Sequence, residues 1–453
     1  MLASSIGFAA VLLLAISGVP LGFSMLLVGS IGFAILRSAM VGSSLVSFGA
    51  GGVSVDWGNL VAGFAMAGQQ MFDVSTNYGF TVVPLFILMG AFIHRADLST
   101  ELYDAANALV GHRRGGLAMG TVVACGGFAA VCGSSVATAA TMGRVAMPSM
   151  RRYGYADSLS TGAIAAGGTL GILIPPSVPM VIYGILAEAD VGKLFIAGIL
   201  PGILLTVLFV IAVALRTMMN PEIGPPGERL GWHERMRALG RVWGIIVLFL
   251  MIIGGIYAGI FTPNEAAGIG AAGAFLFALA RRKLGLRSTF EALIESSITT
   301  GMIFIVTIGA LVFSNFITIA GLTSAMTEWI TGLNATPIHI ILAICLIYIV
   351  MGCVFDTLAM LILTVPVFVA ILKPLGVDLI WFGIIVIIVV ELGLITPPIG
   401  MNVFVVNSVV PDVSVWTIFD GIWPFLIAML LCLELILIFP WLATGLPSLM
   451  AFR

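Results

Sequence analysis

The chain has 453 residues, of which 60% are hydrophobic and only 9% are charged, and its formal net charge is −2. Soluble globular chains carry about 25% charged residues, so this composition excludes a cytosolic enzyme, and the missing basic excess argues against nucleic-acid binding. At about 20 apolar residues per helical span, the chain could cross a bilayer roughly ten times. The five scattered cysteines match neither a disulfide framework nor a metal-binding spacing.

The first apolar stretch, residues 6–36, contains no charged side chain. It lacks the basic start of a signal peptide and is longer than the hydrophobic region of one, and Gly18-Val19-Pro20 interrupts it. We therefore expect a broken first transmembrane helix in preference to a signal peptide.

Most Lys and Arg residues fall into four clusters. These are Arg113-Arg114, Arg151-Arg152, Arg229/Arg235/Arg237/Arg241 and Arg281-Arg282-Lys283. From Ser288 to Phe452 only Lys373 is basic. Because Lys and Arg in short loops favour the cytoplasmic side of a membrane, all four clusters are predicted to lie there.

Residues 115–150 form an apolar stretch with an arginine pair at each end. About 35 residues are more than one span requires, and ends on the same face favour a re-entrant helical hairpin. Its tip would be the Gly- and Ser-rich Cys132-Gly133-Ser134-Ser135. Two short tilted spans joined by a tight turn are the alternative.

Three more polar segments lie between the predicted spans. Residues 97–111 carry apolar side chains at helical spacing and predict an interfacial helix. Residues 221–240 predict a proline-broken connector followed by a short amphipathic helix, and residues 281–295 predict a basic loop.

The chain repeats itself across the connector. Gly171-Ile172-Leu173-Ile174-Pro175-Pro176 recurs as Gly393-Leu394-Ile395-Thr396-Pro397-Pro398, and the first tip has a weaker counterpart in Gly352-Cys353-Val354-Phe355-Asp356-Thr357. The second apolar hairpin, at residues 338–373, lies in the part of the chain almost free of Lys and Arg. The charge rule therefore puts its ends on the opposite face. Two halves of opposite orientation form an inverted-topology repeat, the design of many secondary transporters.

The double prolines predict helices that are interrupted within the membrane. Proline removes a backbone donor and clashes with the preceding turn, so carbonyl oxygens are freed near mid-bilayer. Such carbonyls, with one or two hydroxyls, suit Na⁺, while the N-termini of half-helices suit an anionic substrate. An ordinary proline kink would explain one copy alone, but two copies at matching places favour a site.

Acidic residues within apolar stretches are costly and point to function. Asp356 in the second tip is the best candidate for lining a site, although a structural Asp bonded to backbone amides fits the same position. Glu391 precedes the second double proline and fits hairpin packing equally well, and Glu434 is expected at an interface or paired with a partner helix. No phosphate-binding loop and no histidine metal spacing occurs in the chain, so ATP hydrolysis and metal catalysis are not predicted.

Four motifs run through the chain in a recognisable order: residues 132–140 (CGSSVATAA), 168–177 (GTLGILIPPS), 259–267 (GIFTPNEAA) and 396–402 (TPPIGMN). With these motifs, nearly the whole chain resembles the large membrane (M, or DctM-type) subunit of tripartite ATP-independent periplasmic (TRAP) transporters. The resemblance implies an all-α polytopic membrane protein of the bacterial inner membrane, with a scaffold and a moving transport domain that works by an elevator mechanism.

The resemblance also implies Na⁺ as the coupling ion and a small organic anion as substrate, such as a C4-dicarboxylate, sialic acid or a similar carboxylate or sulfonate. Two partner proteins are implied, a small membrane (Q) subunit and a soluble periplasmic substrate-binding (P) subunit. A fused Q subunit would add further spans at the N-terminus, so we expect Q to be a separate chain.

The family's ion and substrate residues can be carried over by motif. One Na⁺ site would use Cys132, Ser135, Gly171, Ile174 and Pro176, and the other Gly352, Gly393, Thr396 and Ile399. The substrate is expected near Ser134, Thr138, Asp356 and Asn402.

Four parts are expected along the chain. They are N-terminal scaffold helices (1–80), the first repeat (81–220, with its hairpin at 115–150 and interrupted helix at 161–187), the connector and further scaffold helices (221–295), and the second repeat (296–453, with its hairpin at 338–373, interrupted helix at 379–411 and last span). A stand-alone Na⁺/dicarboxylate-type carrier is the main alternative, followed by an ion channel and, more weakly, an intramembrane enzyme.

Overall fold

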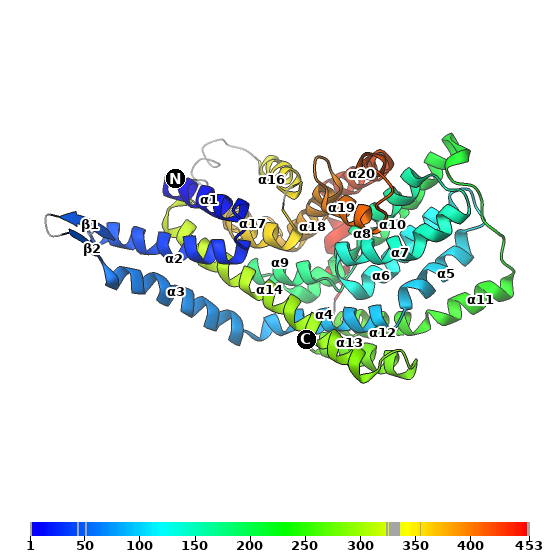
Figure 1. Ribbon diagram of the computed structural model, residues 1–453, viewed down its shortest axis with the longest axis horizontal. Coiled ribbons are helices and arrows are strands. Elements are labelled where there is room, and N and C mark those ends of the chain that lie inside the picture. The colour runs from blue at the N-terminus through cyan, green and yellow to red at the C-terminus, as the bar shows by residue number, and fades with distance from the viewer. Residues whose placement is uncertain are drawn as a thin grey trace. The chain divides into compact units, whose positions relative to one another are not determined.

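The computed structural model describes residues 2–42, 45–49, 52–322, 325, 336–353 and 355–450. These parts are almost entirely helical (Figure 1), which confirms the predicted all-α membrane fold class. The exception is a short antiparallel hairpin of β1 (Val46–Gly49) and β2 (Gly52–Val55), in which Val46 pairs with Val55. No periodicity in the sequence had indicated these strands.

The chain divides into two compact units that do not follow chain order. Unit 1 contains Met1–Phe80, Ile298–Ile344 and Leu361–Val377, and unit 2 contains Thr81–Ser297, Cys345–Met360 and Asp378–Arg453. The predicted N-terminal scaffold residues therefore fall into unit 1. The predicted connector and its neighbouring helices share unit 2 with both hairpin tips.

Unit 1 is built from N-terminal helices and parts of later ones. It contains α1 (Leu2–Ile16), α2 (Leu21–Met40), the two strands, α3 (Trp57–Thr76), most of the 3₁₀ turn η1 (Tyr78–Thr81), the later part of α14 (Leu286–Ile319), and the outer parts of α16 (Pro337–Gly352) and α17 (Thr357–Leu372) with the turn η3 (Lys373–Leu375).

The predicted break at Gly18-Val19-Pro20 is present, but it separates two helices instead of bending one. Gly18 has a φ of +92°, which glycine adopts at no steric cost. The turn lets α1 and α2 pack together, with the ring of Phe316 beside glycines of both helices. A Cβ built on Gly32 would lie 2.6 Å from that ring. Small residues thus allow the close helix approach that is typical of membrane bundles.

Unit 2 begins with α4 (Val82–Arg95), α5 (Leu98–Val110), α6 (Gly116–Cys132), α7 (Ser135–Arg152), α8 (Asp157–Leu173), α9 (Val178–Leu186), α10 (Val191–Met219), the turn η2 (Pro221–Ile223), α11 (Trp232–Arg241), α12 (Trp243–Tyr257), α13 (Pro263–Ala280) and the start of α14. It continues with the tip between α16 and α17, then α18 (Leu379–Ile395), α19 (Met401–Val409), α20 (Val415–Ile438) and α21 (Trp441–Ser448). The interfacial helix expected at residues 97–111 is α5, and the amphipathic helix of the connector is α11.

The sequence repeat is visible as the same succession of helices. The hairpins α6–α7 and α16–α17 have helices of 17 and 18 residues and of 16 and 16 residues. Each is followed by a 17-residue helix, a proline break and a 9-residue helix, α8–α9 and α18–α19. A long helix with an internal proline closes each succession, at Pro201 in α10 and Pro424 in α20.

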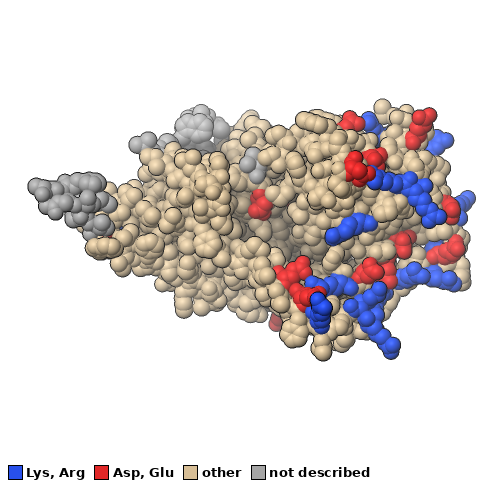
Figure 2. Space-filling model, viewed as in Figure 1, with Lys and Arg blue, Asp and Glu red and all other residues tan. Residues whose placement is uncertain are grey.

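Six described helices are long and apolar enough to cross a membrane, and up to eight if each of two bent pairs is counted as one span. This is fewer than the roughly ten crossings that length alone allows, because much of the apolar sequence lies in helices of 17 residues or fewer, such as α6, α16 and α18. Exposed apolar side chains recur along α10 at Ile203, Val207, Ile211 and Leu215. On the face shown in Figure 2, most of the charged side chains gather in one part of the surface.

The connector brings the four basic clusters together within unit 2. The backbone N–H groups of Gly115 and Ala156, at the two feet of the first hairpin, donate to connector carbonyls over 2.8 and 3.0 Å. The guanidinium of Arg281 donates to the carbonyl of Arg241 over 2.9 Å. Both feet of the hairpin therefore lie beside the same backbone segment of the connector, an arrangement that fits both a re-entrant hairpin and two tilted spans joined by a tight turn.

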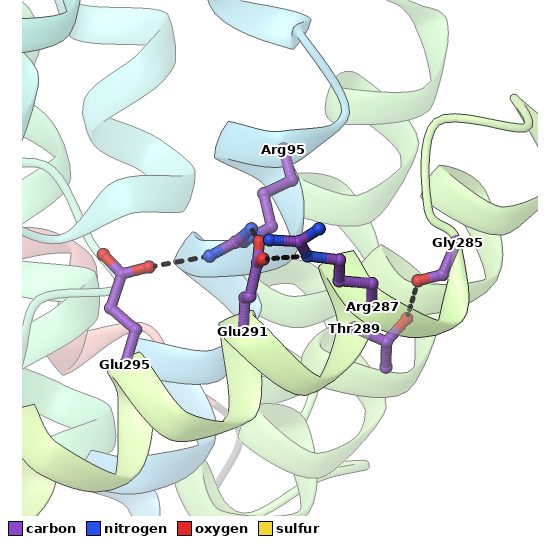
Figure 3. A network of polar contacts seen from close by, with 6 residues as sticks. All are labelled: Arg95, Gly285, Arg287, Thr289, Glu291 and Glu295. Carbon is purple, nitrogen blue, oxygen red and sulfur yellow. Dashed lines mark hydrogen bonds and ion pairs between the residues drawn. The ribbon is translucent and has the colours of Figure 1, made fainter.

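A network of ion pairs ties the end of α4 to the start of α14 in unit 2 (Figure 3). Arg95 contacts Glu291 at 3.2 Å and Glu295 at 3.0 Å, and Arg287 contacts Glu291 at 3.0 Å. The carboxylates are half to two-thirds exposed, so solvent screens these ion pairs and each contributes little to stability. Together they position the first turns of α14 against α4.

Candidate functional site

The first hairpin tip lies where the sequence predicted it, between α6 and α7. Gly133 ends α6 with a φ of +64°, a conformation that glycine adopts without strain. The hydroxyl of Ser134 then accepts the backbone N–H of Ala137 at 3.4 Å and caps α7. The tip is thus a two-residue turn made by residues suited to end one helix and start the next.

The first proline break separates α8 from α9. Pro175 and Pro176 have no N–H, so the carbonyls of Gly171 and Ile172 lose the donors that a continuous helix would supply. The peptide bond between the two prolines is cis, as is that between Pro397 and Pro398 in the second repeat. The freed carbonyl oxygens are the groups that the sequence assigned to a cation.

The first tip packs directly on the first break. A Cβ built on Gly171 would lie 2.6 Å from the carbonyl oxygen of Ser134 and 2.9 Å from Oγ1 of Thr138. A Cβ built on Gly133 would lie 3.0 Å from the carbonyl oxygen of Pro176. The structure therefore places Gly171 and Pro176 of the predicted first ion site against Ser134 and Gly133 of the tip, with the backbones in contact because glycine stands at positions 133 and 171.

The second tip meets the second break in the same manner. A Cβ built on Gly393 would lie 2.6 Å from Cα of Gly352, so the two backbones touch. The thiol of Cys353 lies 3.3 Å from the carbonyl oxygen of Pro397. The hydroxyl of Thr396 donates to the carbonyl of Leu392 over 2.6 Å and keeps its lone pairs available. Val354 in this tip lies outside the described residues, and Ile399, beyond the break, is 41% exposed.

The predicted substrate residues lie on different elements of unit 2. Ser134 and Thr138 belong to the first tip, where the hydroxyl of Thr138 donates to the carbonyl of Ser134 over 2.7 Å. Asp356 accepts the backbone N–H groups of Leu358 at 2.9 Å and Ala359 at 3.4 Å. It therefore caps α17, which is the structural role that the sequence had left open beside site lining.

Asn402, the fourth predicted substrate residue, is buried in α19 against α8. Its amide nitrogen lies 3.5 Å from the carbonyl oxygen of Ala165, and its Oδ1 has no hydrogen-bond partner among the described residues. A buried amide oxygen without a donor is costly. This oxygen is therefore an unused acceptor in a side chain that is fully buried in the structure.

Glu391 was not among the predicted site residues, although its place in an apolar stretch had marked it. Its carboxyl oxygen Oε2 accepts the hydroxyl of Ser135 at 2.6 Å, and both side chains are only 1% exposed. The acidic residue two positions before Gly393 is the signal that could have placed it in the site.

An exposed ion-pair cluster joins the foot of the first hairpin to the second repeat. Arg151 at the end of α7 contacts Asp157 at 3.0 Å and Asp412, in the turn before α20, at 2.6 Å. Hydrogen bonding to Arg151 lowers the pKa of the Asp412 carboxyl below its ordinary value. The negative charge of Asp412 is thus favoured in the folded protein.

We expect Asp412→Asn to lower the thermal midpoint slightly at neutral pH and not at acid pH. The folded-state pKa of Asp412 is depressed, so its contribution is present above the unfolded pKa of about 3.9 and is lost as the pH falls through the folded value. Thermal unfolding of the purified protein between neutral and acid pH measures this. Asp420→Asn, an exposed carboxylate in the second turn of α20, is the matched control, and a pH-independent difference for Asp412→Asn would contradict the assignment.

Comparisons with known proteins found a matching family model and related sequences. The family model described as "Tripartite ATP-independent periplasmic transporter, DctM component" matches residues 8–442. The C4-dicarboxylate TRAP transporter large permease protein DctM of Pseudomonas aeruginosa is 35% identical over 84% of this chain and 88% of its own length. The sialic acid TRAP transporter large permease protein SiaM of Vibrio cholerae is 30% identical over 96% of both chains.

The fold also resembles a solved transporter. The crystal structure of YdaH from Alcanivorax borkumensis, which was described as having an unusual topology, matches with a TM-score of 0.66. The match covers 93% of this chain and 99% of that one at 13% sequence identity. At this identity the likeness concerns the fold alone.

Proposed function

The chain belongs to the DctM component family of tripartite ATP-independent periplasmic transporters, and from this premise we propose that it imports a small organic anion coupled to Na⁺. As a large permease of this family it is a transport protein and not an enzyme. It is a multi-pass protein of the bacterial inner membrane, in keeping with the six to eight apolar spans found among the described residues.

The Na⁺ coupling is supported by the two matching tip-and-break arrangements in unit 2. In each, a hairpin tip rests on a glycine one turn before a double proline, at Gly171 and Gly393. The prolines cannot supply the usual helical donor to either glycine carbonyl, and that of Gly393 accepts the N–H of Thr396 at 3.2 Å instead. Carbonyl and hydroxyl oxygens are hard ligands of the kind that bind Na⁺ at unwound segments of transporters. Two such arrangements correspond to two ion sites.

The nature of the substrate is supported by the relatives. One is named for a C4-dicarboxylate and the other for sialic acid, and both compounds carry a carboxylate. We propose a small organic acid for this chain too, bound between the two tips, with the N-terminus of α7 and the amide of Asn402 as polar contacts. Binding of such an anion is favoured by the partial positive charge at a helix N-terminus.

The transport mechanism is proposed to be of the elevator type. Both tips and both proline breaks belong to unit 2, so one compact body would carry both proposed ion sites. Such a body is suited to move as a whole across the bilayer once it is loaded. The family's tripartite name implies two further components, which we propose to be a separate small membrane subunit and a periplasmic substrate-binding protein.

Uptake of radiolabelled organic acids into proteoliposomes tests the proposal. The vesicles contain this chain with its small subunit, and the assay is run with and without an inward Na⁺ gradient and with and without the cognate binding protein. We expect uptake only when both are present. Uptake with Na⁺ but without the binding protein would instead identify a stand-alone carrier, and uptake insensitive to Na⁺ would overturn the coupling.

A further inference from the structure

A buried hydrogen bond joins the first hairpin tip to the second repeat. Ser135, the first residue of α7, donates its hydroxyl to Oε2 of Glu391 on α18 over 2.6 Å. The two residues are 256 positions apart in the chain. Both lie in unit 2, so the contact is internal to one compact body.

Among the described residues, the Ser135 hydroxyl is the one hydrogen-bond partner of the Glu391 carboxyl group. Its second carboxyl oxygen, Oε1, is buried and has no hydrogen-bond partner among the described residues. The helix around it is apolar, and its other buried side chains, from Phe382 to Ile395, carry no ionisable group. A buried carboxyl with a single partner is strongly disfavoured when that partner is removed. A shift of Ser135 must therefore be followed by α18, or the carboxyl is left without any hydrogen bond.

Each end of the hydrogen bond is next to one of the two tip-and-break contacts. Ser135 directly follows Ser134, whose carbonyl oxygen rests against Gly171 of the first break. Glu391 lies two residues before Gly393, whose backbone touches Gly352 of the second tip. One side-chain hydrogen bond thus connects the backbone segments that would hold the two ions.

We propose that Glu391 is a positioning residue that couples the two ion sites. An ion bound at the first tip sets the place of Ser135, and the hydrogen bond to Glu391 then aligns the helix that carries Gly393 for the second ion. The inference rests on the proposed Na⁺ coupling and concerns the same sites. Coupling of this kind raises the affinity for one ion when the other is bound, typically by about 5- to 150-fold.

The Na⁺ dependence of uptake in the proteoliposome assay tests the coupling. We expect a Hill coefficient above one for the unaltered chain, and a lower coefficient for Ser135→Ala and for Glu391→Ala. The half-saturating Na⁺ concentration should rise by about fivefold or more in each. Glu391→Gln keeps a carbonyl oxygen that can accept the Ser135 hydroxyl, so it should restore part of the cooperativity. Glu434→Gln on α20 alters an exposed glutamate and is the matched control.

A double variant and a binding measurement separate coupling from a structural effect. Ser135→Ala combined with Glu391→Ala should shift the Na⁺ dependence no further than either change alone, because both remove one interaction. Thermal stabilisation by NaCl, compared with KCl, should show the same loss of cooperativity in the absence of transport. Should Glu391→Ala fail to fold, Ser135→Ala and Glu391→Gln carry the test, since they remove one hydroxyl or replace one carboxyl oxygen with an amide nitrogen.

The outcomes distinguish this inference from the proposed function. An unaltered chain with Na⁺-driven uptake and a Hill coefficient of one would overturn the coupling and leave the proposed function standing. The same holds if the variants lower only the maximal rate and keep the Na⁺ dependence. Uptake by the unaltered chain that ignores Na⁺ would overturn both.

Discussion

Replacing Gly393 with valine is expected to reduce Na⁺-driven uptake by about 100-fold. A Cβ at this position would lie 2.6 Å from Cα of Gly352, and backbone cannot move aside as a flexible side chain can. The second tip must then shift away from the proline break, and a displacement of about 1 Å at a reacting or binding centre can cost about 100-fold in rate. Initial rates of uptake under an inward Na⁺ gradient measure the loss.

Gly254→Val on α12 is the matched control for this change. No atom lies within 4 Å of a Cβ built on Gly254, so the same side chain is added to a helix without a clash. We expect its uptake to equal that of the unaltered chain. If Gly393→Val transported normally with an unchanged Na⁺ requirement, the second tip would not be an ion site.

Replacing Gly421 with valine is expected to destabilise unit 2 by about 1–3 kcal/mol or more, because it forces apart two closely packed helices. A Cβ on Gly421 of α20 would overlap the carbonyl oxygen of Ser158 on α8 and lie 3.3 Å from Cα of Gly162. The thermal midpoint of the detergent-solubilised protein should fall accordingly. The variant should also lose monodispersity on size-exclusion chromatography before it loses its helical content.

Gly445→Val on α21 serves as the control for Gly421. The nearest atom to a Cβ built there is in Trp441 at 3.7 Å, an ordinary van der Waals contact. Its thermal midpoint should match that of the unaltered chain. Equal midpoints for Gly421→Val and Gly445→Val would show that α8 and α20 are not held together by this glycine contact.

The positions of the tips and breaks could be predicted from the sequence because their causes are local. Proline lacks an N–H wherever it stands, and a Gly-Ser pair permits a left-handed residue followed by a helix cap. These effects act within about one helical turn of the residues that cause them. The turn at Gly133-Ser134 and the breaks at Pro175-Pro176 and Pro397-Pro398 accordingly lie where they were predicted.

Other features of the structure could be predicted only in part from the sequence. A break at Gly18-Pro20 was evident, but whether it bends one helix or separates two depends on what the two segments can pack against. The ring of Phe316, almost 300 residues later, provides that surface in unit 1. Asp356 likewise had two open roles, and its hydrogen bonds to the backbone at the start of α17 identify it as a cap.

By itself the sequence determined that this is a helical membrane protein, built from two similar halves with a proline-broken helix in each. Only the tertiary structure decided that Glu391 meets Ser135 and that Gly421 meets Gly162. The reason lies in the nature of the helices. A helix that is apolar all round, such as α18, has no hydrophobic stripe to indicate which side faces which neighbour. Its partners are therefore set by how several helices pack at once, and no pattern along one of them contains that information.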